Sequence, residues 1–203
     1  DFIRVYHFRY GTTTRTFPSP WIELADDSNS TNSIGIAYLI ASGGETTVTV
    51  TKSATERFSA IADKILAANW HGTTPPEISV VAKGNSAFPN PDGFNPAGWG
   101  LEDTLWTAVC AYDTAAGENP ITAYPAFYID NNTNSPHVAS AGRGGIATRE
   151  NAVHIDDPGG FTITSDEWLA YTIAVRPAGA TTPNVAAWMH ATQSGGMVGR
   201  QYV

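Results

Sequence analysis

Apolar and polar residues alternate with a period of two along much of this 203-residue chain. In the opening stretch DFIRVYHFRY, Phe2, Tyr6 and Phe8 fall on one side, and Ile3 and Val5 fall on the other. Side chains of a β-strand point alternately to its two faces, and aromatic and β-branched residues are favoured there. The chain therefore begins with a predicted strand.

The same alternation returns at intervals, and clusters of glycine, proline, asparagine and aspartate separate the repeats, as expected for turns. The further predicted strands are NSIGIAYLIAS (32–42), ETTVTVTKS (45–53), EISVVA (77–82), TLWTAVCAYDT (104–114), GGIATRENAVHI (144–155), GFTIT (160–164) and EWLAYTIAVRP (167–177). Gly43 and Gly44 would join the first two of these into a hairpin. So many short strands predict an all-β fold, a two-sheet antiparallel β-sandwich of jelly-roll type with long loops. The residues expected to help fill the space between the sheets are Trp106, Val109, Ile173 and Val175.

One segment, TERFSAIADKILAANW at residues 55–70, has a different period. Phe58, Ile61, Ile65 and Leu66 recur at the spacing of an amphipathic helix, and the segment is rich in good helix formers. A strand is also available, with Ile61 and Ile65 on one face and Asp63 interrupting it. The residues themselves leave helix and strand open, although the period favours a helix.

Two long stretches lack any clear period. Residues 83–103 contain three prolines and four glycines, which predict a long loop that Phe88, Phe94 and Trp99 could anchor. After Pro177 the sequence becomes small and polar. We therefore expect a sandwich domain over 1–177 and an extended C-terminal arm over 178–203. The arm's spaced apolar residues are candidate contacts with its own domain or a neighbouring subunit; they are Trp188, Met189 and Met197.

The bulk composition excludes several classes of partner. The 19 acidic and 11 basic residues give a formal charge of −8, and the basic residues are scattered singly, so nucleic acid is not expected as a partner. No apolar run reaches the roughly 18–20 residues that cross a bilayer, so no membrane partner is expected. Cys110 is the only cysteine and lies in an apolar run, where it is predicted to be a buried small hydrophobe.

The stretch ENAVHIDDPGG at residues 150–160 is the most suggestive of chemistry. His154, Asp156 and Asp157 lie within four positions, and histidine and carboxylate are common metal ligands. The alternative is a strand that ends in a turn, because Asp-Pro favours turn initiation and Gly159-Gly160 tolerates positive φ. Without a second ligand cluster in the sequence, we interpret the stretch as a strand end and predict no metal.

Other motifs give no positive signal for catalysis. Adjacent carboxylate pairs such as Glu102-Asp103 point to opposite faces of a strand, the glycine-rich SAGRGG (140–145) lacks a dinucleotide or P-loop context, and no G-x-S-x-G elbow occurs. The sequence predicts no catalytic residue and no cofactor. Exposed aromatic side chains near loops could stack on sugar rings; the candidate glycan-binding residues are Tyr124, Tyr128 and Trp99.

In the order of its strands the chain resembles a β-rich family found in tailed-bacteriophage genomes and viral metagenomes, largely virion structural proteins. The order is DFIRVYHFRYG, TFPSPWIEL, the run from NSIGIAYLIAS to ADKI, WGLEDTLWTAVCAYD, ITAYPAFYIDNN, IATRENAV and DDPGGFTITSDEWLAYTIAVRP. The similarity covers most of residues 1–177, although Pro18-Ser19-Pro20-Trp21 stands where the family usually has Pro-x-Gly-Trp. It implies that residues 56–68 form a strand, against their period.

The resemblance also implies a function. It predicts a non-enzymatic virion structural protein, either a capsid-surface decoration or a tail-associated component, that assembles as a homo-oligomer. Its partners would be copies of itself and other virion proteins, in a particle assembled in the host cytoplasm and released outside the cell. Two alternatives stay open from the residues: a lectin-like module that recognises host surface glycans, and a glycoside hydrolase with carboxylates on separate loops.

Overall fold

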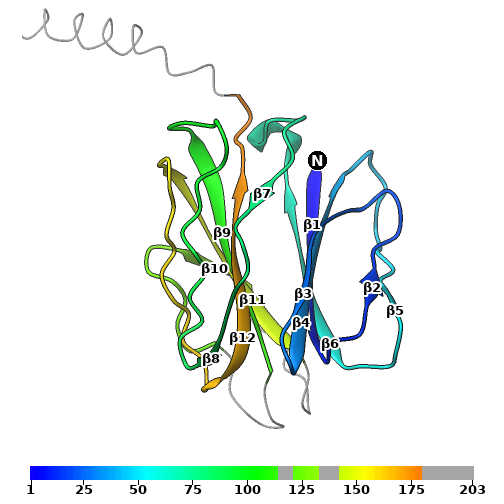
Figure 1. The fold of residues 1–203 in the computed structure, drawn as a ribbon. Helices are drawn as coiled ribbons and strands as arrows, with labels where there is room; N and C mark the ends of the chain where they lie inside the picture. Colours follow the sequence, from blue (N-terminus) through cyan, green and yellow to red (C-terminus); the bar gives the residue numbers. More distant parts are fainter. Residues whose placement is uncertain (114–120, 133–141, 180–203) are drawn as a thin grey trace, which may run out of the picture.

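The computed structural model describes residues 1–113, 121–132 and 142–179, and it shows two β-sheets packed face to face (Figure 1). All strand pairs among these residues are antiparallel, and their one helical element is the short 3-10 turn η1 (Ala67–Asn69). The predicted all-β, two-sheet antiparallel sandwich is therefore confirmed, while the jelly-roll connectivity stays a prediction. None of the helices among the described residues is long and apolar enough to cross a membrane.

The first sheet has the strand order β3-β4-β1-β6. Its members are β1 (Phe2–Tyr10), β3 (Ile22–Ser28), β4 (Asn32–Ile40) and β6 (Phe58–Ile65). The predicted opening strand is thus confirmed as a central strand, paired on both sides. Its even-numbered residues face the second sheet, whereas Val5 and His7 face outward.

The second sheet has the order β10-β11-β9-β12-β7, and β8 also pairs with β12. Its members are β7 (Glu77–Ile78), β8 (Ala82–Ser86), β9 (Asp103–Tyr112), β10 (Ile129–Asn132), β11 (Arg143–Ala152) and β12 (Asp166–Val175). The three long central strands are those that the alternation predicted. The predicted strand GFTIT is wrong: its one bridge pairs Thr162 with Ala123, and the amides of Phe161 and Ile163 donate to loop carbonyls, because prolines and glycines surround the segment.

The space between the sheets is filled by aromatic and β-branched side chains. From the first sheet come Tyr6, Phe8, Ile34, Ile36 and Ile61, and from the second come Val109, Ala111, Ile146, Leu169, Tyr171 and Ile173. Val175 closes one end of this core beside Phe2 and Trp70. The predicted core positions of Val109, Ile173 and Val175 are confirmed. The placement of Trp106 is wrong, because it has the opposite parity to Val109 on β9 and lies on the outer face of the sheet.

That outer face is covered by a layer of loops. Trp106 and Trp168 of the sheet pack there with Trp99, Phe161 and Ile163 from the loops. The long proline-rich loop therefore has a structural role, in which Trp99 and Phe94 hold it against the sheet as expected. Phe88, the third proposed anchor, is instead 65% exposed.

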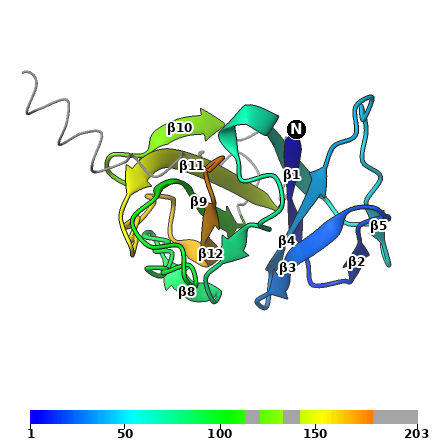
Figure 2. The same ribbon diagram turned by 90° about the horizontal axis from the view of Figure 1, so that it is seen from above.

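The outer face of the first sheet carries a flap, residues 11–21 and 43–57, whose strands β2 (Arg15–Thr16) and β5 (Thr51–Lys52) pair with each other (Figure 2). Val48 and Val50 pack on Val5 and Phe17 beneath it. The predicted hairpin through Gly43-Gly44 is wrong in its pairing. The strand after the turn, β5, is short and pairs with β2 instead of β4.

Residues 58–65 form β6, an edge strand of the first sheet beside β1, so the strand implied by the resemblance is confirmed and the helix indicated by the period is not. Ile61 and Ile65 point to the core, while Ala60 and Ala62 are exposed. Asp63 takes a position between the two isoleucines because Arg4 of β1 lies opposite it. Pairing with a neighbouring strand overrides the local helix preference.

Candidate functional site

The three aromatic residues proposed to bind glycans do not form an exposed platform. Trp99 and Tyr128 are only 7% and 9% exposed, and both belong to the cluster beneath the loop layer. Tyr124 is half-buried and packs edge-to-face on Phe161, with ring centroids 5.7 Å apart. Stacking on a sugar needs an open ring face, so these side chains serve the core in this structure.

Tyr128 belongs to a buried polar network built around Asp156. The Asp156 side chain is 1% exposed, accepts a hydrogen bond from the Tyr128 hydroxyl and forms an ion pair with Arg149. The guanidinium of Arg149 also lies 4.7 Å from the centre of the Tyr128 ring, a cation–π contact. Burial raises the pKa of Tyr128, so this hydroxyl stays protonated and acts as a donor.

This network explains the stretch that looked most like a metal site. The strand β11 ends at Ala152, and Gly159 adopts a φ of 75° in the following turn. His154 and Asp157 are exposed, and within the described ranges no three His, Cys, Asp or Glu side chains gather as metal ligands. Asp156 is therefore a structural carboxylate in the turn.

A second buried ion pair lies between the two sheets. Arg4 is 1% exposed; its Nε donates to Oδ1 of Asp63 over 2.9 Å, and its Nη1 donates to Oγ1 of Thr107 on the opposite sheet over 2.9 Å. Burial by itself would lower the pKa of Arg4, but the charge of Asp63, the neighbouring Tyr6 and the hydrogen bond to Asp63 together outweigh burial and raise it. The ion pair joins β1 and β6 within the first sheet, and the Arg4–Thr107 hydrogen bond links that sheet to the second.

A third polar cluster, formed by His7, Arg9, Arg15, Asp26 and Glu56, lies beneath the flap. The Nε of Arg15 is 2.9 Å from Oδ1 of Asp26, and its Nη1 donates to the backbone oxygen of His7 over 2.6 Å. The Nε of Arg9 is 2.6 Å from Oε2 of Glu56. These contacts fix the flap on the first sheet.

Burial disfavours the charged forms of the side chains in this cluster. Burial lowers the pKa of Arg15 to about 10 and raises the pKa of Asp26, even though the two groups attract each other. Burial and the charges of Arg15, Arg9 and Lys52 lower the pKa of His7 to about 3, so this histidine is neutral at physiological pH.

Sequence reasoning missed these buried ion pairs, because their basic members look like isolated surface residues along the chain. A signal was present for Arg4, which lies at the same strand parity as Phe2 and Tyr6 and therefore on the core face. No comparable local signal marks Arg9 and Arg15, whose partners come from distant segments.

The large apolar side chains that remain exposed lie at the margins of the sandwich. They include Val80 between β7 and β8, Ile129 on the edge strand β10, Leu66 beside η1 and Leu101 just before β9. Phe127, 90% exposed, precedes β10 and has a φ of 67°, an uncommon conformation for a residue other than glycine.

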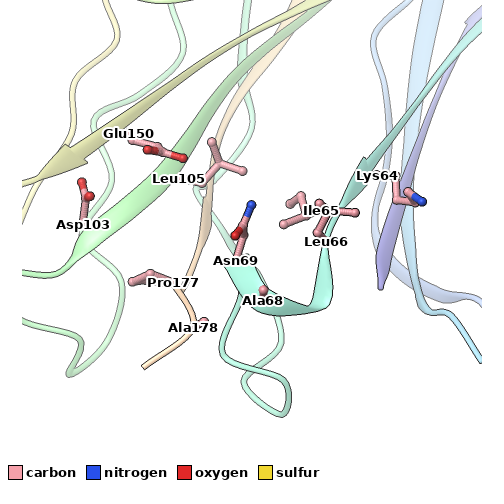
Figure 3. Close-up of a pocket in the computed structure, with 10 residues that line it drawn as sticks. All are labelled: Lys64, Ile65, Leu66, Ala68, Asn69, Asp103, Leu105, Glu150, Pro177 and Ala178. Carbon is pink, nitrogen blue, oxygen red and sulfur yellow. The ribbon is translucent and has the colours of Figure 1, made fainter. Parts of the chain in front are cut away.

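One of these margins is hollowed into a groove of about 420 Å³ at the end of the sandwich where the N terminus lies (Figures 1 and 3). Its lining residues are Lys64, Ile65, Leu66, Ala68, Asn69, Asp103, Leu105, Glu150, Pro177 and Ala178. Figure 3 shows Asp103 and Glu150 on one wall and Ile65 and Leu66 on the other, with Lys64 at the far side from both carboxylates. We call this hollow the end groove.

The end groove combines an apolar contact with two carboxylates. Leu66 is 52% exposed and offers an apolar contact, while Asp103 and Glu150 offer exposed carboxylates to a cationic or hydrogen-bond-donating ligand. The described residues that line it include no histidine, cysteine, serine or threonine.

Trp188, Met189 and Met197, the predicted contacts of the C-terminal arm, lie outside the described residues. No protein-family model, no curated protein and no solved structure matches this chain.

Proposed function

We propose that this protein is a non-enzymatic structural component of a bacteriophage particle, either a capsid-surface decoration or a tail-associated protein, that assembles as a homo-oligomer. The observation that carries the proposal is the distribution of exposed apolar side chains. They lie on edges and ends of the sandwich, at Val80, Leu66, Leu101, Phe127 and Ile129, and these are the surfaces that neighbouring copies can reach.

The covered faces support the same conclusion. Loops lie over the outer face of the second sheet, and the flap covers part of the outer face of the first. Edge strands carry unpaired backbone groups that a neighbouring chain can use, and β10 has β11 as its one neighbour among the described strands. Contacts with copies of itself and with other virion proteins are therefore expected at the margins.

The disposition of charge argues against catalysis as the role. Four of the described basic residues, Arg4, Arg9, Arg15 and Arg149, are engaged with carboxylates inside the fold, where they hold layers together. The resemblance of the strand order to virion structural proteins adds the biological setting. A position in the particle, assembled in the host cytoplasm and extracellular after release, follows from that setting.

The mass of the purified chain in solution tests assembly. Sedimentation over a wide range of concentration should give a multiple of 21.6 kDa, and Ile129→Lys should lower the mass by placing a charge at an apolar margin. A chain that remains a monomer at every concentration would refute the proposal. Immunogold labelling of intact particles in the source sample then tests its place in a virion.

A lectin-like module is a second candidate, and Phe127 favours it. Its ring is 90% exposed, and aromatic faces stack on sugars. Binding on a glycan array that disappears in Phe127→Ala, but persists in the matched variant Phe88→Ala at another exposed ring, would favour host-glycan recognition over a purely structural role. The glycoside hydrolase alternative predicts turnover of a polysaccharide that Asp103→Asn or Glu150→Gln abolishes.

A further inference from the structure

Resting on the proposed self-assembly, we infer that the end groove receives residues 180–203 of a second copy of this chain. The described chain ends beside this groove, and Pro177 and Ala178 line it. The segment that follows has 24 residues, which is long enough to extend well beyond its own domain.

The exit of the chain at the groove has a fixed position. The Nε of Arg176 donates to Oε2 of Glu102 over 2.7 Å, and the backbone oxygen of Arg176 accepts a hydrogen bond from the His71 amide over 3.0 Å. These contacts hold Arg176, the residue that follows the end of β12, between the start of β9 and the loop after η1. The following residues therefore start from a defined point on the rim.

The segment and the groove have matching chemistry. All 19 acidic side chains of the protein lie before residue 180, so the segment has none, and it contains Arg200 and His190. The groove presents Asp103 and Glu150 beside the exposed Leu66. The apolar residues Trp188 and Met189 can cover Leu66, while a basic side chain can approach the carboxylates.

The reach of the segment favours a neighbour over the chain's own groove. Trp188 and Met189 come ten and eleven residues after Ala178, which corresponds to as much as about 33 Å of extended chain. Because Ala178 itself lies in the groove, docking in the same copy would require the chain to reverse over that distance. Docking in a neighbour needs no reversal, and reciprocal exchange would give a closed dimer or ring.

Complementation between two full-length variants tests this inference. Leu66→Asp blocks the groove and leaves the segment intact, whereas Trp188→Asp alters the segment and leaves the groove intact. Each variant should weaken self-association about tenfold or more, measured by sedimentation, as expected for an apolar anchor at an interface. An equimolar mixture should regain assembly, because the segment of one chain can enter the groove of the other.

Matched controls keep the test specific. Ile22 on β3 is 49% exposed, close to the 52% of Leu66, and lies outside the groove, so Ile22→Asp should leave assembly unchanged. Asp103→Lys, at an exposed position, is a second groove variant in case Leu66→Asp unfolds in a thermal melt.

The outcomes separate this inference from the proposed function. A wild-type oligomer that persists in Leu66→Asp, Asp103→Lys and Trp188→Asp would overturn the inference and leave the structural role standing. Loss of assembly in each folded variant without recovery in the mixture would overturn docking between copies. A wild-type chain that never associates would refute the proposed function as well.

Discussion

Single residues in this protein show how burial changes the meaning of a polar side chain. His7 looks like a surface residue of an alternating strand, yet it lies 2% exposed beneath the flap and stacks on Phe58, with ring centroids 4.9 Å apart. Asp156 looks like a turn residue, yet its carboxylate organises Tyr128 and Arg149. In both, tertiary contacts set the role of the side chain.

His7 should make the fold sensitive to acid. Its folded-state pKa of about 3 lies below the ordinary value of 6.5. Between these two values the unfolded chain therefore binds a proton at His7 that the folded chain does not bind. The folded state is therefore favoured fully above pH 6.5 and loses stability as the pH falls toward 3, by up to about 2 kcal/mol at pH 5.

The substitution His7→Asn tests this dependence, because its amide oxygen can replace Nδ1 as an acceptor for Arg15, 3.3 Å away in the wild type. Urea unfolding at pH 7 and pH 5 should show a smaller loss of stability on acidification in the variant than in the wild type. Equal losses in the two proteins would show that His7 does not control the acid response.

Asp156→Asn should destabilise the protein by about 3 kcal/mol or more, because it leaves the charge of Arg149 half-buried without its carboxylate. Tyr128→Phe removes one hydrogen bond to the same carboxylate and should cost about 1.5–3 kcal/mol. Chemical denaturation measures both. A melting temperature of the wild type that rises on addition of Zn²⁺ or Ca²⁺ would instead restore a metal role for this turn.

At the scale of the elements, the flap and β6 show long-range contacts deciding local structure. The helical spacing over 58–65 yields to pairing with β1, which places Asp63 opposite Arg4. The threonine-rich run after Gly44 forms only the short β5, since its valines pack down onto the first sheet. Neither result follows from propensity, because both depend on which segments lie beside them.

Gly35 on β4 sets the fit of the flap. A Cβ atom at this position would lie 2.4 Å from Cδ of Arg15, so Gly35→Ala should displace that side chain from Asp26 and destabilise the protein by about 1–3 kcal/mol. Hydrogen exchange should speed up in residues 11–21 and 43–57 before it changes in β9 and β12.

A double-mutant cycle gives the control for this change. If the clash with Arg15 is the cause, Gly35→Ala should cost much less in an Arg15→Ala background than in the wild type. Equal costs in both backgrounds would place the strain elsewhere on β4.

At the scale of the whole molecule, the described clusters form a complete set of layers within residues 1–179: the loop layer, two sheets and the flap (Figure 2). Deletion of residues 180–203 should therefore change the melting temperature by only about 1–2 °C. The same deletion should reduce the mass in solution to that of one chain. A large fall in melting temperature would show that the segment supports its own domain.

The sequence by itself determined the β class, the long strands β1, β4, β9, β11 and β12, and the turn at Asp156 to Gly160. These features are local, because a period of two and the φ preferences of glycine and proline act within a few residues. It also placed Val109 and Ile173 in the core, since strand parity fixes which side chains share a face.

Only the tertiary structure decided that Trp106 lies on the outer face of β9, that residues 58–65 form an edge strand, and that Tyr128 and Trp99 are buried. The partners of Arg4, Arg9 and Arg15 were likewise decided there, as was the end groove, to which β6, β9, β11 and the chain after β12 all contribute. Such contacts join segments that are far apart along the chain. Their free energy depends on which strands become neighbours, and no local pattern encodes that choice.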